Sequence, residues 1–148
     1  MKIFLGAELE GAAGNKWFVL QKEFNKKLLS LDNKNYGDEL IHIGIISIIM
    51  REEFFVDGAY KERRHINRKT KTTDIRLRID YNKFVKSSNE TRRQLYIEHI
   101  TEAIRISGEK AGKTFETERL IEDVLVLLNE NQNQSEDGSL SYVNSWVK

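Results

Sequence analysis

Cysteine and proline are both absent from this sequence of 148 residues. Without cysteine the chain cannot form disulfide bonds or thiolate metal sites, and it has no cysteine nucleophile. The absence is also typical of proteins that stay in a reducing compartment. Without proline, no helix has to kink where a backbone N–H is missing. Apolar burial, hydrogen bonds and charge must therefore hold the fold together.

Long apolar runs are absent as well. No stretch approaches the ~20 apolar residues of a membrane-spanning helix. The apolar run at the N-terminus is short and is followed by Glu8 and Glu10, which is unlike the hydrophobic region of a secretory signal. We therefore expect a cytoplasmic protein that makes no contact with a membrane.

Charge and length are ordinary for a globular protein. Charged residues make up 32% of the chain and hydrophobic residues 39%, and the formal net charge is +1. A near-neutral total argues against a general binder of polyanions, although local patches can still bind them. The length predicts a single core. We assign residues 1–130 to one α+β domain and residues 131–148 to a polar tail that can add an edge strand.

Residues 74–81 alternate between charged and apolar side chains without a break. The apolar set is Ile75, Leu77, Ile79 and Tyr81, and the charged set is Asp74, Arg76, Arg78 and Asp80. Side chains on a strand point to opposite faces with a period of two. The pattern therefore predicts a half-buried strand, and the sheet built on it has a charged face in contact with water.

Hydrophobic periodicity and turn residues indicate the other elements. Strands are expected at residues 2–9, 39–50, 59–68 and 74–81, and helices at residues 16–31, 91–107 and 115–128. The third and fourth strands form an antiparallel hairpin, residues 82–84 close the fourth strand, and Gly108 and Gly112 mark the end of the second helix. The order β-α-β-β-β-α-α predicts an α+β two-layer sandwich, a mostly antiparallel sheet of about four strands with helices packed on one face.

A cluster of positive residues marks the predicted hairpin. Its members are Lys61, Arg63, Arg64, Arg68, Lys69 and Lys71, continued by Arg76 and Arg78. The cluster is either an anion-binding surface for nucleic acid or an acidic protein, or a solvated hairpin whose charges prevent strand-to-strand aggregation. Aromatic side chains for stacking on bases are few, with only Tyr60 and Tyr81 nearby, which disfavours nucleic acid.

Acidic residues and histidines give no clear catalytic or metal site. Glu8 and Glu10 can join Asp74 and Asp80 as an acidic group, but ion pairs with Arg76 and Arg78 explain them more simply. Asp57, Glu62 and Arg64 imitate a nuclease metal site loosely, and an arginine cannot serve as a neutral base. His42, His65 and His99 lack ligand spacing, and His99 is expected at the boundary of a helix's apolar stripe. We predict no catalytic residue, no metal and no cofactor.

Several short segments, taken in order, resemble one known family. They are residues 1–4 and 6–8, Tyr36-Gly37, the isoleucine-rich strand, residues 60–62, residues 74–81 and Phe84, with a helix beyond. This succession resembles the bacterial polymorphic-toxin immunity proteins, in particular immunity family forty-four, over about residues 1–107. The resemblance implies a cytoplasmic protein that binds the C-terminal domain of a cognate toxin, often a nuclease, and blocks it without catalysis.

On that resemblance the charged sheet face is the expected interface. The partner-binding residues are then Glu8, Glu10, Tyr60, Lys61, Glu62, Arg64, Arg76 and Arg78. Mixed charge on such a face suits steering and partner choice. The alternative is a small protein that binds or processes nucleic acid with the basic hairpin, residues 61–78.

Overall fold

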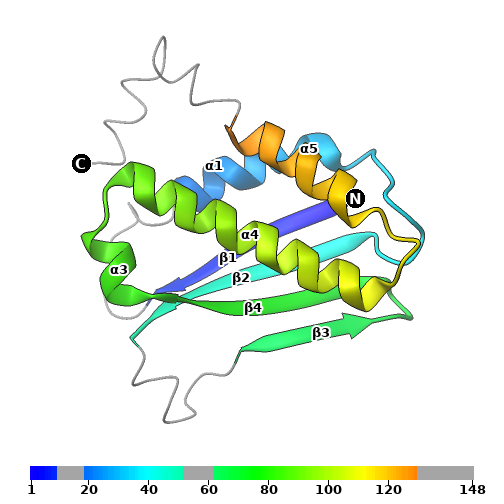
Figure 1. The fold of residues 1–148 in the computed structure, drawn as a ribbon, viewed down its shortest axis with the longest axis horizontal. Helices are drawn as coiled ribbons and strands as arrows, with labels where there is room; N and C mark the ends of the chain where they lie inside the picture. The colour runs from blue at the N-terminus through cyan, green and yellow to red at the C-terminus, as the bar shows by residue number, and fades with distance from the viewer. Residues whose placement is uncertain (10–18, 52–61, 130–148) are drawn as a thin grey trace.

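The computed structural model describes residues 1–9, 19–51 and 62–129. Within these ranges the chain forms a four-stranded sheet in the order β1-β2-β4-β3 (Figure 1). The strands are β1 (Lys2–Leu9), β2 (His42–Met50), β3 (Arg63–Asn67) and β4 (Thr72–Asp80). The tail predicted at residues 131–148 lies outside the described residues.

The sheet is mixed rather than mostly antiparallel. β1 pairs with β2, and β2 with β4, in parallel, and β3 alone pairs antiparallel, with β4. β3 runs back along the sheet, so β4 again runs in the direction of β2 and lies between β2 and β3. Placing β4 in the centre buries its three apolar side chains Ile75, Leu77 and Ile79, whereas β3 offers Ile66 alone. The predicted α+β class is confirmed, and the predicted strand direction is corrected.

The helices follow the predicted order with one addition. They are α1 (Val19–Leu28), continued by the 3₁₀ helix η2 (Leu29–Leu31), then α3 (Tyr81–Lys86), α4 (Asn89–Ala111) and α5 (Thr117–Asn129). Residues 82–84 therefore belong to the short helix α3 and do not close the fourth strand. The Asp80 carboxylate accepts a hydrogen bond from the amide of Lys83 at 2.9 Å and so caps α3, which turns the chain away from the sheet.

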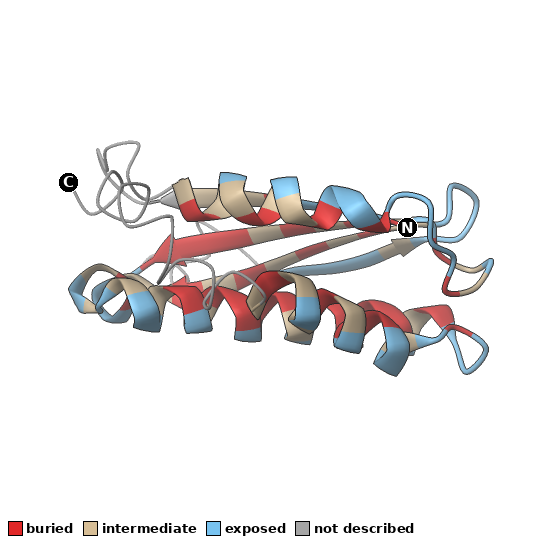
Figure 2. Ribbon diagram, turned by 90° about the horizontal axis from the view of Figure 1, so that it is seen from above, coloured by how far each residue is buried: buried red, intermediate tan, exposed pale blue. Residues whose placement is uncertain are grey.

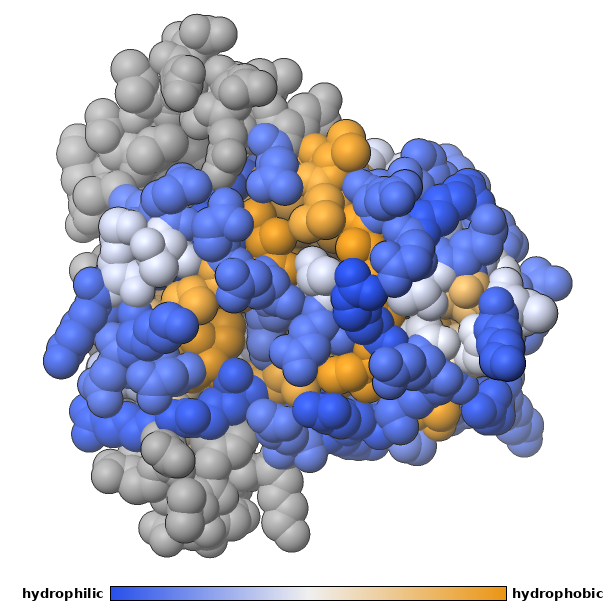
Figure 3. All heavy atoms as spheres, viewed as in Figure 1, coloured by the Kyte–Doolittle hydropathy of each residue, from blue (hydrophilic) through white to orange (hydrophobic). Residues whose placement is uncertain are grey.

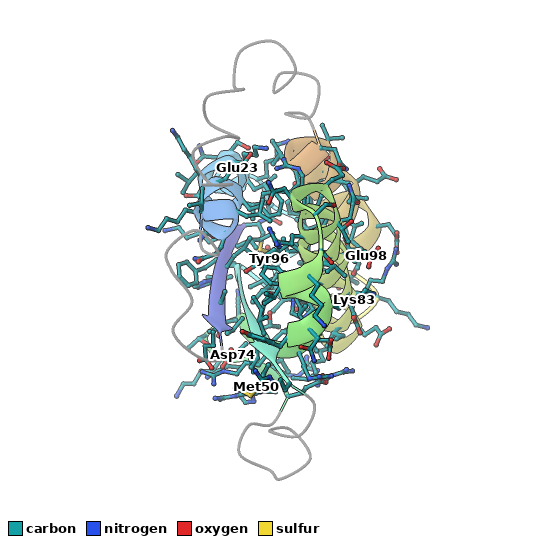
Figure 4. The ribbon with its side chains drawn as sticks, turned by 90° about the vertical axis from the view of Figure 1, so that its left-hand side faces the viewer. Glu23, Met50, Asp74, Lys83, Tyr96 and Glu98 are labelled. Carbon is teal, nitrogen blue, oxygen red and sulfur yellow. The ribbon has the colours of Figure 1, made fainter. Side chains whose placement is uncertain are left out.

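The helices bury one face of the sheet. Ile43, Ile45 and Ile75 are almost fully buried on that face, and Figure 2 shows the buried positions of α4 turned toward the strands. The aromatic ring of Tyr96 packs edge-to-face against Phe24 and Phe84, with centroids 6.3 and 5.7 Å apart. Tyr96 thereby joins α1, α3 and α4, and it lies between the helices and the sheet in Figure 4.

Arg93 ties α4 to two other helices from a nearly buried position. Its guanidinium lies 3.3 Å from the Glu23 carboxylate of α1 and donates a 2.8 Å hydrogen bond to the carbonyl of Leu128 near the end of α5. It also lies 5.0 Å from the centroid of the Phe24 ring. The planar guanidinium can satisfy these partners together because its donors point in several directions.

The outer edge of β1 is closed by side chains of α1. The Asn25 amide oxygen accepts from the backbone N–H of Leu5 at 2.7 Å, and the side-chain amides of Gln21 and Asn25 donate to the Leu5 carbonyl at 2.7 and 2.8 Å. These hydrogen bonds replace those that another strand would make at the middle of β1. Helix α1 therefore covers this edge of the sheet as well as closing the core.

Gly108 lies inside α4 because the neighbouring helix is too close for any side chain. The helix continues past it to Ala111, and Gly112, with φ of +112°, ends it. A Cβ atom at Gly108 would lie 2.8 Å from the Cβ of Thr117 at the start of α5, a contact that rotation of the threonine cannot relieve. The sequence therefore identified the end of the helix correctly at Gly112 but not at Gly108.

Replacing Gly108 with alanine should lower the free energy of unfolding by about 2 kcal/mol. The added methyl group must separate α4 from α5, and this outweighs the gain of about 1 kcal/mol that alanine brings to a helix. Chemical denaturation measures the change. Glu109→Ala, on the exposed side of the same turn, is the control. An alanine variant as stable as the parent would show that the two helices are not packed this closely.

Candidate functional site

The side of the sheet turned away from α4 carries the predicted charged face. We call it the open face and define it by the described side chains Phe4, Glu8, His42, Ile46, Arg63, His65, Asp74, Arg76, Arg78 and Asp80. Asp74 lies on this side in Figure 4, opposite α4. No helix in the described ranges covers the open face. The opposite, helical side has a mostly hydrophilic surface with interrupted apolar areas (Figure 3).

Ion pairs balance the charges of the open face. Arg76 lies 4.0 Å from the Glu8 carboxylate, Arg78 2.8 Å from that of Asp80, and Arg63 3.4 Å from that of Asp74. These pairs agree with the ion pairing expected for Glu8 and Asp80. Each is at least partly exposed, and such pairs contribute only about 0–1 kcal/mol to stability. Their main effect is to hold charged groups of both signs in fixed positions on the surface.

Arg78 is held in place more firmly than its neighbours. Its Nε donates to the Met50 carbonyl at 3.0 Å in addition to the contact with Asp80, and its backbone N–H points to the Glu62 carboxylate at 3.4 Å. Ile48 lies beside Arg78 in the register of β2 and β4. Ile48 and Met50 are buried although they lie outside the main core cluster. At this end of the open face Arg78 is therefore fixed in position beside two buried apolar side chains.

Phe4 is the large exposed apolar residue among those of this face that were not predicted to bind a partner. It is 55% exposed and lies opposite Gly44 on β2, two residues before Gly6. A Cβ atom at Gly6 would lie 3.7 Å from Cε1 of the Phe4 ring and 3.4 Å from Cδ1 of Ile46, so the ring lies over Gly6 beside Ile46. The alternation of Lys2, Phe4, Gly6 and Glu8 could have placed Phe4 on the face of Glu8. An exposed aromatic ring on a face that also carries charged groups is typical of a protein-binding surface.

The structure brings together three of the predicted partner-binding residues. Glu8, Arg76 and Arg78 share the open face, and Glu62 contacts its margin through the backbone of Arg78. Arg64 pairs with Ile75 in the register of β3 and β4, so its side chain leaves from the helical side of the sheet. It remains linked to Glu62 by a 3.5 Å contact. Glu10, Tyr60 and Lys61 lie outside the described residues.

One serine and one histidine are spaced like a catalytic nucleophile and its general base. The Oγ of Ser47 is 2.7 Å from Nδ1 of His99. Their residues are 2% and 6% exposed, and burial lowers the pKa of His99 to about 4. A substrate cannot reach such a pair, because Ser47 of β2 and His99 of α4 meet in the buried layer between the sheet and the helix. His99 is therefore a core residue, not the boundary residue that the sequence predicts.

The described residues offer no arrangement for a metal ion. No three histidine or acidic side chains gather within residues 1–9, 19–51 and 62–129. None of the helices in these ranges combines the length and the apolar character that crossing a membrane requires.

Comparison with known proteins identifies a family. The sequence model of the family described as immunity protein 44 matches residues 1–130. No curated protein and no solved structure matches the chain. The matched residues include every described strand and helix, and with them the whole of the open face.

Proposed function

Because the chain belongs to the immunity protein 44 family, we propose that it neutralises a cognate bacterial toxin by binding the toxin's C-terminal domain through the open face. It acts in the cytoplasm, and it blocks the toxin by occupying surface, without catalysis of its own. The observation that carries this proposal is the open face itself, where Glu8, Arg76 and Arg78 are held in position on a sheet face that no described helix covers.

Binding requires charged groups that are already in place before the toxin arrives. The open face meets this requirement because Arg78 is fixed by Met50 and Asp80, and Arg76 reaches toward Glu8. Charged groups of both signs accelerate encounter and reject partners with the wrong pattern. Phe4 supplies an apolar contact among them, and buried aromatic residues at the centre of an interface carry much of its binding free energy.

The same ion pairs disfavour the nucleic-acid alternative. A surface that follows a phosphate backbone needs arginines and lysines that are free of acidic neighbours. On the open face Arg63, Arg76 and Arg78 each lie beside a carboxylate. Nucleic acid would therefore meet acidic groups across this face as often as basic ones. Salt-sensitive retention of plain RNA by the purified chain would favour the alternative.

Reversing the charge of the open face should weaken binding to the toxin. We expect the variant Arg76→Glu/Arg78→Glu to bind at least about tenfold more weakly and to protect cells poorly against a co-produced toxin domain from the adjacent reading frame. Thermal stability should change little, because these ion pairs contribute little to it. Growth of the co-producing cells and calorimetric titration measure the two effects.

Two further variants separate binding from folding. Arg105→Glu reverses an exposed charge on the helical side and should protect as well as the parent chain does. Glu8→Arg/Arg76→Glu restores an ion pair with its signs exchanged, so it should fold normally and still bind weakly. Full protection by Arg76→Glu/Arg78→Glu would exclude the open face as the interface. A parent chain that protects against no such toxin would exclude the proposed function.

A further inference from the structure

We propose that the outer edge of β3 receives an extended, acidic segment of the toxin, which adds to the sheet as a further strand. The proposal rests on the proposed function and specifies how the toxin is held. It is argued from the difference between the two edges of the sheet, from the direction of the backbone groups of β3, and from the charge along that strand.

The two edges of the sheet are finished differently. At β1 the N–H and carbonyl groups of Leu5 are bonded to Asn25 and Gln21 of α1. At β3 no described side chain or backbone group bonds to the outward N–H or carbonyl of the strand. Every residue of β3 except Ile66 is exposed. An edge with unbonded main-chain groups is a template for strand addition.

The register identifies which groups face outward. The N–H of Arg78 on β4 points past the start of β3 to the Glu62 carboxylate. Backbone groups alternate in direction along a strand, so Arg76 and Asp74 face β3 in the same way and bond to Arg63 and His65, their partners in the antiparallel register. The N–H and carbonyl groups of Arg64 and Ile66 are then directed away from the sheet. They form the row to which an added strand would bond.

Charge along this edge determines what can be added. Residues 63–71 contain five arginine and lysine residues and no acidic residue. Arg63 and Arg64 lie beside Asp74 and Glu62, so the excess of positive charge comes from Arg68, Lys69 and Lys71 after β3. Two copies of this basic segment would repel each other, because like charges brought close together on paired strands are destabilising. An acidic strand gains from the same charges. The edge thus rejects a second copy of itself and admits a strand of opposite charge, which is the selectivity expected of a partner site.

The edge is also held in position. The Asn67 side chain accepts from the amides of Lys69 and Thr70 at 3.0 and 3.1 Å and fixes the turn that follows β3. Arg68 donates to the Lys110 carbonyl near the end of α4 at 2.9 Å. The strand is anchored to the helical layer before any partner binds, so strand addition requires ordering of the toxin segment alone.

Amide hydrogen exchange on the full chain, free and bound to the toxin domain from the adjacent reading frame, tests the proposal. The amides of Arg64 and Ile66 should exchange rapidly in the free chain and slow at least about tenfold in the complex. The amide of His65, already bonded to β4, should be protected in both states. Unchanged exchange at Arg64 and Ile66 in a complex that does form would overturn strand addition and leave the proposed function standing.

A pair of variants at one position tests the hydrogen bond itself. Arg64→Ala removes the side chain and keeps the N–H, whereas Arg64→Pro also removes the N–H, and prolines on an outer edge leave the sheet ladder intact. We expect Arg64→Pro to bind about tenfold more weakly than Arg64→Ala. Equal affinities would overturn the proposal. So would salt-sensitive binding of a single-stranded RNA oligonucleotide that depends on Arg64, since the edge would then bind phosphate. Absence of any complex with the parent chain would instead refute the proposed function.

Discussion

Replacing Arg93 with methionine should lower the free energy of unfolding by about 3 kcal/mol, the low end of the range for breaking a buried ion pair. The Glu23 carboxylate loses its arginine partner and keeps only the ion pair with Lys27 at 3.2 Å. The buried carbonyl of Leu128 loses the hydrogen bond that Arg93 donates to it. Methionine retains most of the apolar volume against Phe24, so the loss reports the polar contacts. Denaturant titration followed by circular dichroism measures it.

A double-mutant cycle with Glu23→Gln isolates the ion pair. Because Glu23 and Arg93 are in direct contact, the two changes together should destabilise by about 1–2 kcal/mol less than the sum of the single changes. Arg93→Lys keeps the charge but cannot reach Glu23 and Leu128 together, so it should fall between the parent chain and Arg93→Met. Additive effects in the cycle would show that α1 and α4 are not coupled through this pair.

Acidification should destabilise the fold through His99. Burial lowers the pKa of His99 from its ordinary value of 6.5 to about 4. Above pH 7 the imidazole is neutral in the folded and unfolded chains and has no effect on the balance. Below pH 6.5 the unfolded chain takes up a proton that the folded chain excludes. The resulting loss reaches about 3 kcal/mol at pH 4 and levels off within about one pH unit below it.

The variant His99→Gln separates this effect from that of the carboxylates. Glutamine can still bond to Ser47 but does not titrate. Between pH 7.5 and pH 4 the parent chain should therefore lose about 3 kcal/mol more of its free energy of unfolding than the variant does. Urea denaturation of both proteins across this range gives the difference curve. Parallel curves would show that His99 takes up its proton as readily in the folded chain as in the unfolded one.

Side-chain periodicity determined which face of the strand at residues 74–81 is buried, but not which strands are its neighbours. The alternation of residues 74–81 placed Arg76 and Arg78 on the open face, and the structure agrees. The same pattern fits a parallel or an antiparallel partner equally well, so the direction of β1 against β2 could not be read from it. The short helix α3 was missed because its first residues continue the apolar alternation of β4, and the signal was the capping residue Asp80.

Residues of the candidate site that follow from side-chain periodicity were predictable. Contacts between residues far apart in the sequence were not. An ion pair of Glu8 with Arg76 or Arg78 was expected, but which arginine it meets, at 4.0 Å, depends on the order of the sheet, which places β2 between the two strands. Phe4 could have been placed on the open face from its spacing with Glu8. The contacts of Arg93 join residues 70 and 35 positions away and leave no local trace in the sequence.

Closure of one edge of the sheet limits what the molecule can build. A fibre grows when each molecule has two binding surfaces, one for each of its two neighbours in the fibre. Here Gln21 and Asn25 seal one side at the middle of β1, so each molecule can be joined along its sheet once. If the proposed toxin segment adds at β3, the product is therefore a complex of fixed composition, and it cannot polymerise further along the sheet.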